Sequence, residues 1–472
     1  MFDGPEASLK SPTPLPWLDS VALRDLVLHE THAACVDARG DVYQWGNVST
    51  QGNIPTTPLK TLRGKNIKQL AINGDRVVAL AETGDVFVLS ATNVQPAASS
   101  SSFKYWDAGD VGGAVELKPR HALTRGERFV SVSVGDHHLL ALTSNGRTFA
   151  HPLSHKANSY GQLGMRHLEF TEGGVSRTID LVPDVVRDPY ALSSPRGRAP
   201  SPRRVIPASA SAKEPSGCNL LFEIPALNGI RISQIAAGSR TSFARTSDGR
   251  VLGWGANEFG QIGLGESISL STIPVPTEVF LWRDVGKGTR TTCTDIQAGG
   301  DLSMFTVERK DGSSIDIVDV LVCGNGQWGG LGNSLFSNAQ GNPVRARGVS
   351  GLHEYNEHMQ NMQPIRPHAV AISPTGHVLV TLETLAGSSG MYGGRDLVVW
   401  GANYDYQLGI GKRGNMANAT TLHRPDGSRY LLQKVEATVK DLEGKVWRKK
   451  VEVEQTAVAG NKASVVYWRI VL

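Results

Sequence analysis

A stretch of fifteen residues occurs twice in this chain in almost the same form, as VLGWGANEFGQIGLG at 251–265 and as LVVWGANYDYQLGIG at 397–411. An internal repeat constrains the fold strongly, because every copy has to form the same small unit. Weaker copies keep parts of its strand and turn, at 41–47, 84–93, 146–164 and 320–332. The chain therefore contains six copies of one half-unit.

A second half-unit precedes each copy. It is clearest in QIAAGSRTSFARTSDG at 234–249, where apolar alternation, a Gly-containing bend, more alternation and Asp-Gly follow one another. This order predicts strand, bend, strand, tight turn and strand. Related segments lie at 70–84 and 131–146, weaker ones at 28–40, 296–312 and 366–376, and a seventh at 457–468.

Repeats of roughly 40–60 residues, each one a small antiparallel sheet, are typical of β-propellers. A single sheet of this kind is apolar on both faces, and radial stacking buries the two faces together. We therefore expect an all-β protein, a seven-bladed β-propeller with about four antiparallel strands in each blade.

The repeated aromatic residue, or the cysteine that replaces it, is expected to face the next blade, and the glycine after it leaves room for a neighbouring backbone. We expect a structural role for these repeat positions: Trp45, Gly46, Trp254, Gly255, Asn257, Gly263, Cys323, Gly324, Trp400, Gly401, Asn403 and Gly409.

These motifs resemble the regulator of chromosome condensation repeat family, whose best-known member is a seven-bladed propeller. The resemblance covers nearly the whole chain and is carried by Trp-Gly-Ala-Asn with Gln-x-Gly in both long copies, and by Ala236-Ala237-Gly238 upstream. The histidine of the family's Gly-x-x-His-Ser element matches His138 and, more loosely, His32. Thr241, Leu302 and Ala463 stand at the equivalent places.

The repeat count bears on the N-terminus, because the preceding half-unit has seven copies whereas the Trp-Gly half-unit has six. Residues 1–20 hold no Trp-Gly strand, so we expect a chain that begins inside the family's first repeat, or a last blade that is incomplete. The expected organisation is an N-terminal extension at 1–25 and a single propeller domain at 26–472, with insertions near 94–127 and 165–229.

Composition agrees with a folded all-β chain, since 52 of the 472 residues are glycine and 40% are hydrophobic. A net charge of +4 does not by itself indicate nucleic-acid binding. The cysteines are widely separated and have no metal-ligand spacing, so we expect reduced thiols at Cys35, Cys218, Cys293 and Cys323.

The centre of the larger insertion, 192–217, is rich in proline, serine and arginine and is expected to be a solvated loop. The alternative is a docking loop for an acidic protein face, a lipid headgroup or RNA. Its basic residues are Arg196, Arg198, Arg203 and Arg204.

Motifs that suggest catalysis have simpler explanations. The GxGxxG at 324–329 coincides with the repeat turn, and no crossover helix follows it as a dinucleotide site requires. His137-His138 lies in a strand beside a bend, which favours a core or interface imidazole over a metal ligand or base. We therefore expect no catalytic residue, no cofactor and no metal, and hence no enzyme.

Two classes of binding function remain. The segments at 2–4, 23–46, 61–80 and 100–109 are similar to the fungal mitochondrial branch of the family. That resemblance implies a mitochondrial protein held at the inner membrane by an N-terminal segment that this chain lacks, and a role in assembly of ubiquinol–cytochrome c reductase (complex III). The alternative is guanine-nucleotide exchange on a small GTPase, as in the nuclear branch, with a cytoplasmic or nuclear location. Met1–Ser20 has one lysine and no arginine, so nucleic acid is not an expected partner.

Overall fold

The computed structural model describes residues 9–18, 21–46, 58–91, 113–172, 175–181, 183, 219–266, 270–281, 285–286, 288–310, 312, 316–385, 394–424 and 426–471. Within these residues the regular structure consists of strands and two short 3-10 helices, η1 at Pro16–Leu18 and η3 at Pro225–Leu227. No helix in this part of the chain is long and apolar enough to cross a bilayer.

Most strands fall into antiparallel groups of four that follow the chain. The first group is β2 (Asp25–Leu28), β3 (His32–Val36), β4 (Val42–Gly46) and β5 (Leu59–Leu62). The second is β6 (Ile67–Ile72), β7 (Arg76–Ala81), β8 (Val86–Ser90) and β9 (Ala114–Pro119). The third is β10 (Phe129–Val134), β11 (His138–Thr143), β12 (Thr148–Pro152) and β15 (Leu220–Glu223).

The next three groups repeat this order. The fourth is β16 (Ile232–Ala237), β17 (Thr241–Thr246), β18 (Val251–Ala256) and β19 (Thr272–Val279). The fifth is β20 (Arg290–Gly299), β21 (Leu302–Lys310), β22 (Ile317–Gly326) and β23 (Ser337–Arg345). The sixth is β26 (Arg366–Ile372), β27 (His377–Glu383), β28 (Arg395–Gly401) and β29 (Met416–Thr421), and β30 (Leu431–Leu432) also pairs with β28.

The seventh group joins the two ends of the chain. Its order is β1 (Ala22–Leu23), β33 (Ser464–Ile470), β32 (Val446–Ala459) and β31 (Lys434–Lys440). Two hairpins lie outside the groups, β13 (His167–Glu172) with β14 (Val175–Asp180), and β24 (His353–Asn356) with β25 (Asn361–Pro364). The second and third groups also join as one eight-stranded sheet, because β15 pairs in parallel with β9.

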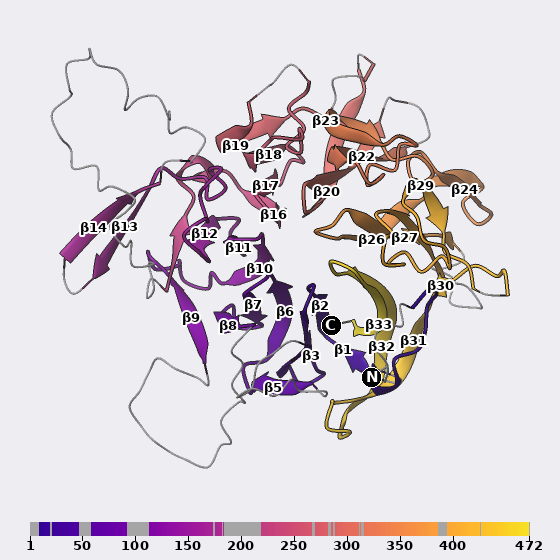
Figure 1. Cartoon of the computed structure of the whole chain (residues 1–472), viewed down its shortest axis with the longest axis horizontal. Helices are drawn as coiled ribbons and strands as arrows, with labels where there is room; N and C mark the ends of the chain where they lie inside the picture. Colours follow the sequence, from indigo (N-terminus) through magenta and orange to yellow (C-terminus); the bar gives the residue numbers. More distant parts are fainter. Residues whose placement is uncertain are drawn as a thin grey trace.

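The groups form a ring around a common centre (Figure 1). The strands that face this centre contact one another in the order β2, β6, β10, β16, β20, β26 and β32, and β32 contacts β2 again. This arrangement confirms the predicted all-β propeller, and we interpret each group as one blade. The middle strands are buried along their length, as in β11, because each sheet packs against a neighbour on both faces.

Glutamine side chains join neighbouring inner strands where no backbone ladder exists. The Gln69 amide donates to the Val132 carbonyl over 3.0 Å and accepts from the Val132 N–H over 3.3 Å. Gln234 does the same with both backbone atoms of Ile296, over 3.0 and 3.1 Å. Each amide therefore makes the pair of hydrogen bonds that a residue of a neighbouring strand would make. These bonds fix the position of one group relative to the next.

The seventh group differs from the other six, and the expectation of an incomplete last blade stays a prediction. Three of its strands are β31, β32 and β33, and the remaining one is the two-residue β1, which pairs in parallel with β33 instead of antiparallel. β1 and the start of β2 also lie within 1–25, which the sequence assigns to an extension. Similarly, β9 and β15 belong to the second and third groups although they lie inside the expected insertions.

The segment 366–376 differs from the other copies of the second half-unit. Its Thr375-Gly376 forms the bend between β26 and β27, and not the tight turn after a second strand that the repeat pattern predicts. The connection from β27 to β28 runs from Glu383 to Arg395 and is longer than in the other groups, so the usual spacing to Trp400 is lost.

Candidate protein-binding face

Four loops with the repeated motif follow the third strands of groups three to six. Their described residues are 153–166, 257–266 with 270–271, 327–336 and 402–415, and we call them the rim loops. The end of each third strand pairs with the start of the second strand, as Gly255 does with Thr241 and Gly401 with His377. Each rim loop therefore lies at the same end of its sheet as the bend before the second strand.

The repeated asparagine and glutamine shape three of the four rim loops from within, whereas the loop at 327–336 has Gly326 and Gly330 at these two places. The Asn257 side-chain oxygen accepts from the Ile262 N–H over 3.2 Å, and the Gln261 side-chain oxygen accepts from the Phe259 N–H over 2.9 Å. Asn403 accepts from the Leu408 N–H over 3.0 Å in the same way. Since these side chains satisfy backbone groups that have no ladder partner, they make the loop a fixed structure.

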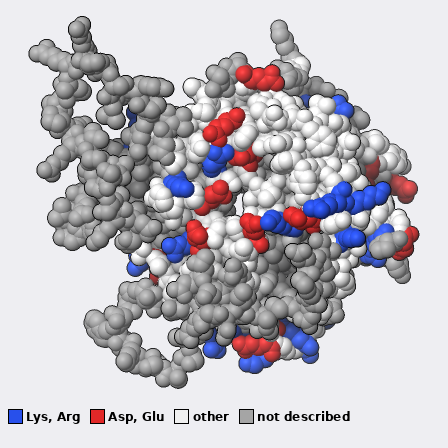
Figure 2. Space-filling model, viewed as in Figure 1, with Lys and Arg blue, Asp and Glu red and all other residues white. Residues whose placement is uncertain are grey.

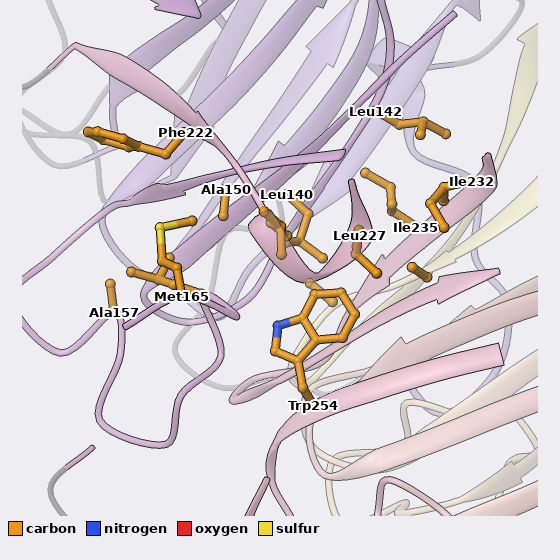
Figure 3. Packing of buried hydrophobic residues seen from close by; sticks show 14 of the residues in the cluster. Leu140, Leu142, Ala150, Ala157, Met165, Phe222, Leu227, Ile232, Ile235 and Trp254 are labelled. Atoms are coloured by element: carbon orange, nitrogen blue, oxygen red, sulfur yellow. The ribbon is translucent and has the colours of Figure 1, made fainter. Parts of the chain in front are cut away.

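The repeated tryptophan fastens each sheet to the rim loop of the preceding group. The Trp254 indole N–H donates to the Gln162 carbonyl over 2.9 Å, and the Trp400 indole donates to the Gly330 carbonyl over 2.9 Å. Both side chains are fully buried. Figure 3 shows Trp254 among Leu140, Leu227 and other apolar side chains of the third and fourth groups. Cys323 keeps this geometry with a thiol, which donates to the Gln261 carbonyl over 3.3 Å.

At the position after the aromatic residue, any residue larger than glycine would collide with a neighbouring backbone. Gly255 has a φ of 108°, and a Cβ there would lie 2.4 Å from the Arg240 carbonyl oxygen. Gly401 has a φ of 99°, and its Cβ would lie 2.2 Å from the Gly376 carbonyl oxygen. Gly46 and Gly324 have the same conformation and the same close carbonyl. These positions explain the aromatic-Gly pair in physical terms.

Trp45 differs from the other two tryptophans. It is half-buried, and its ring packs edge-to-face against Trp17 at a centroid distance of 4.9 Å. Trp17 belongs to η1, so an N-terminal aromatic stands where a rim loop contacts Trp254 and Trp400. The asparagine and glycine positions at Asn257, Asn403, Gly263 and Gly409 lie in the rim loops themselves.

Histidines support the same end of the sheets. His138 is fully buried, and its Nε2 lies 2.9 Å from the Ser242 hydroxyl, which donates to the Gln162 carbonyl over 2.8 Å. Burial lowers the pKa of His138 to about 3, so its imidazole is neutral. His377 makes the matching contact to Ser464 over 3.1 Å, and burial lowers its pKa to about 3 as well. Sequence reasoning missed His377, although its place directly after a bend glycine is a usable signal.

Apolar side chains gather on three of the rim loops. Leu270, Leu335, Phe336 and Tyr404 are 62%, 60%, 58% and 45% exposed. Trp328 packs edge-to-face against Tyr404 at 5.2 Å, which joins the fifth and sixth groups at this surface. Exposed apolar and aromatic residues grouped in this way mark interaction surfaces. These residues lie between the repeat positions, so the repeat pattern did not point to them.

A charged cluster continues the same surface over the fourth and fifth groups. The Arg240 guanidinium contacts Glu258 over 2.6 Å and Asp301 over 3.1 Å, and lies 4.7 Å from the Tyr160 ring centroid. The carboxylate of Asp301 raises the pKa of Arg240 against the effect of burial. On the face drawn in Figure 2, acidic and basic side chains are intermixed over the described part of the ring.

The other candidates from the sequence carry no site in the described residues. Among them, no cluster of His, Cys, Asp or Glu has the geometry of a metal site. Cys35, Cys293 and Cys323 are buried free thiols, and burial raises the pKa of Cys293 to about 12. Cys218 and the docking-loop residues Arg196, Arg198, Arg203 and Arg204 lie outside the described residues.

The geometry above agrees with a match to a known repeat. Models of the regulator of chromosome condensation (RCC1) repeat match residues 232–261 and 248–306. The chain carries RCC1 repeats. The matched region covers the fourth group and the start of the fifth, including Trp254, Gly255 and the second rim loop. The RCC1 repeat is thus, in this chain, a sheet together with the loop that fastens the next sheet.

Several curated proteins are similar over part of the chain. The ultraviolet-B receptor UVR8 of Arabidopsis thaliana is 23% identical over 274 residues, covering 56% of this chain and 48% of that protein. Protein FMP25, mitochondrial, of Saccharomyces cerevisiae is 28% identical over 281 residues, covering 56% and 42%. RCC1 domain-containing protein RUG3, mitochondrial, of Arabidopsis thaliana is 25% identical over 329 residues, covering 64% and 58%. The chain spans about half the length of these relatives.

Solved RCC1-repeat structures have a similar fold. Prp20p from Saccharomyces cerevisiae aligns with a TM-score of 0.58 at 17% identity, covering 98% of this chain and 86% of that one. Human WBSCR16 aligns with a TM-score of 0.56 at 15% identity, covering 95% and 87%. At these identities the likeness concerns the fold alone.

Proposed function

We propose that this chain is a non-enzymatic, protein-binding propeller of the mitochondrion. The observation that carries the proposal is the exposed apolar surface on the rim loops, made by Leu270, Leu335, Phe336 and Tyr404. In each of these loops an asparagine side chain, Asn257, Asn333 or Asn403, accepts a hydrogen bond from a backbone N–H of the same loop. A rigid scaffold that presents aromatic side chains loses little conformational entropy when it binds a partner.

The mitochondrial location is supported by two relatives, FMP25 and RUG3, whose names place them in that organelle. Within it, we propose a role in assembly of complex III at the inner membrane, with assembly intermediates as partners. The support for this step is the resemblance of the segments at 23–46, 61–80 and 100–109 to the fungal mitochondrial branch of the family.

A loss-of-function experiment tests the proposal. In cells that lack this chain, mature complex III should fall, measured by native gel electrophoresis and by ubiquinol–cytochrome c reductase activity. The unmodified chain should restore it, and the variant Trp328→Ala/Phe336→Asp should not. Val446→Asp is a matched control, because Val446 is 49% exposed on β32, away from the rim loops. Normal complex III in the absence of the chain would contradict the assembly role.

Guanine-nucleotide exchange is the alternative function, and a separate assay measures it. Purified chain is mixed with small GTPases loaded with fluorescent GDP, and the rate of release is compared with and without the chain. Release that is accelerated, in a background of normal complex III, would replace assembly with exchange. Under either function, assembly or exchange, we expect the partner to bind at the rim loops.

A further inference from the structure

The rim loops contact the next group through one repeated backbone hydrogen bond. The Gly265 N–H donates to the Gly341 carbonyl over 3.0 Å, and the Ser334 N–H donates to the Ala417 carbonyl over 2.9 Å. Both donors follow the last motif glycine by two residues and have a positive φ, 103° and 72°. Both acceptors lie in the fourth strand of the next group, β23 and β29. The bond thus fixes the outer edge of each sheet.

The sixth group makes the same bond to the N-terminal segment. The Gly411 N–H, also with a positive φ of 74°, donates to the Lys10 carbonyl over 2.8 Å. A proline contact repeats as well. A Cβ on Gly263 would lie 3.2 Å from Pro343, and a Cβ on Gly409 would lie 3.4 Å from Pro12. In each case the proline follows the accepting residue by two positions. Leu9–Pro12 therefore occupies the place of a fourth strand.

Tyr406 distinguishes this loop from the other three. Its position corresponds to Gly161, Gly260 and Gly329, which all have a positive φ and a neighbouring backbone within 2.8 Å of a built Cβ. Tyr406 keeps the same conformation with a φ of 61°, which is costly for a bulky residue. Strain of this kind persists where it serves a contact. Here the Lys10 ammonium lies over the Tyr406 ring, 5.9 Å from its centroid.

We propose that the rim loop of the sixth group, at 402–415, is a binding slot for an extended Lys-x-Pro segment. The chain's own Leu9–Pro12 fills this slot. The Gly411 N–H donates to the backbone carbonyl of the segment, and Gly409 leaves room for the proline ring. The Tyr406 ring contacts the lysine ammonium. Proline holds the segment extended before it binds, which lowers the entropy cost. The slot closes the ring with a segment that can be released, and it goes beyond the binding face proposed above.

A synthetic peptide of residues 6–16 with a fluorescent label tests the slot in the full chain. The variant Lys10→Glu/Pro12→Asp releases the internal segment. Fluorescence anisotropy should show the peptide binding to this variant at least tenfold more tightly than to the unmodified chain, because the internal segment competes at a high effective concentration. A peptide with the same two substitutions is the control and should not bind. Adding Tyr406→Gly to the released variant should weaken binding by about twofold to fivefold, as the loss of an exposed cation–π contact predicts.

Two results would overturn the proposal. One is no peptide binding to a released variant whose circular dichroism is unchanged, and the other is equal binding to the variant and the unmodified chain. If the variant does not fold, hydrogen exchange on the unmodified chain decides. The segment containing Gly411 should then exchange as slowly as the segment containing Gly265, and exchange as fast as a free peptide would contradict the slot.

Discussion

The indole nitrogen of Trp254 lies 2.9 Å from the carbonyl oxygen of Gln162, so a side chain of the fourth sheet is bound to a loop of the third. The same bond joins Trp400 to Gly330 between the fifth and sixth groups. Neighbouring sheets share no backbone ladder at these places, so the stability of the ring depends on side-chain bonds of this kind together with apolar packing.

Removing the indole N–H should weaken the ring at one interface. Trp254→Phe and Trp400→Phe keep most of the apolar area but remove one buried hydrogen bond each. Trp400→Phe takes the indole donor from the Gly330 carbonyl, whereas in Trp254→Phe the Gln162 carbonyl keeps the Ser242 hydroxyl as a donor. We expect a loss of about 1–3 kcal/mol in the free energy of unfolding, measured by chemical denaturation. Trp45→Phe is the control, because Trp45 is half-buried and packs against Trp17, and its loss should be smaller. Equal effects at all three positions would contradict the assigned bonds.

Placing a methyl group at the repeated glycine should be severe. In Gly255→Ala the new Cβ meets the Arg240 carbonyl at 2.4 Å in a backbone conformation that disfavours alanine. A loss of about 2 kcal/mol or more in unfolding free energy is expected. Gly74→Ala is a matched control, since its nearest neighbour is 3.8 Å away and its φ is not positive. A tolerated Gly255→Ala, with an unchanged melting temperature, would show that the close approach is absent.

The buried carboxyl of Asp25 should make stability depend on pH. Burial raises the pKa of Asp25 to about 6, although the N–H groups of Leu70 and Leu26 donate to it over 2.7 and 2.9 Å. The folded state therefore holds this proton more tightly than the unfolded chain does. The unfolding free energy should fall as pH rises from about 4 to about 6, by roughly 3 kcal/mol from this group. Asp25→Asn should remove that slope, whereas the exposed Asp85→Asn should not. Parallel pH profiles for wild type and Asp25→Asn would refute it.

Glu454 should have the opposite dependence on pH. It accepts hydrogen bonds from His368 over 3.2 Å, from Arg395 over 2.8 Å and from Arg469. The contacts with His368 and Arg469 hold the pKa of Glu454 well below its usual range. Its contribution is present at neutral pH and is lost as pH falls below about 4. Glu454→Gln should cost about 3 kcal/mol at pH 7 and much less near pH 3.

The control for Glu454 lies on the same strand. Glu452 is exposed and pairs with Lys434 over 2.8 Å, so Glu452→Gln should change the unfolding free energy by less than about 1 kcal/mol. If both substitutions have the same small effect in denaturation experiments, the seam between the sixth and seventh groups does not depend on Glu454.

Local patterns in the sequence predict the parts of this fold that each repeat builds by itself. Trp254, Gly255 and Asn257 could be assigned because their neighbours in the sheet and loop are close in the chain. His377 was missed because a longer connection to Trp400 breaks the spacing. The roles of β15 and of Leu9–Pro12 were missed because both depend on contacts with distant residues, which no local pattern encodes. The exposed rim residues were missed for another reason: they vary between repeats, and a search for recurrence ignores variation.

The central claim is that the rim loops are the face that binds a partner in the mitochondrion. Its most direct test is a photo-activated cross-linking residue at Phe336, in mitochondria that contain the full chain, with a second one at Asp248 in the turn between β17 and β18 at the opposite end of a sheet. We predict that the probe at Phe336 cross-links to complex III subunits or their assembly intermediates and that the probe at Asp248 does not. Cross-links to these proteins from Asp248 alone, or from neither position, would contradict the account.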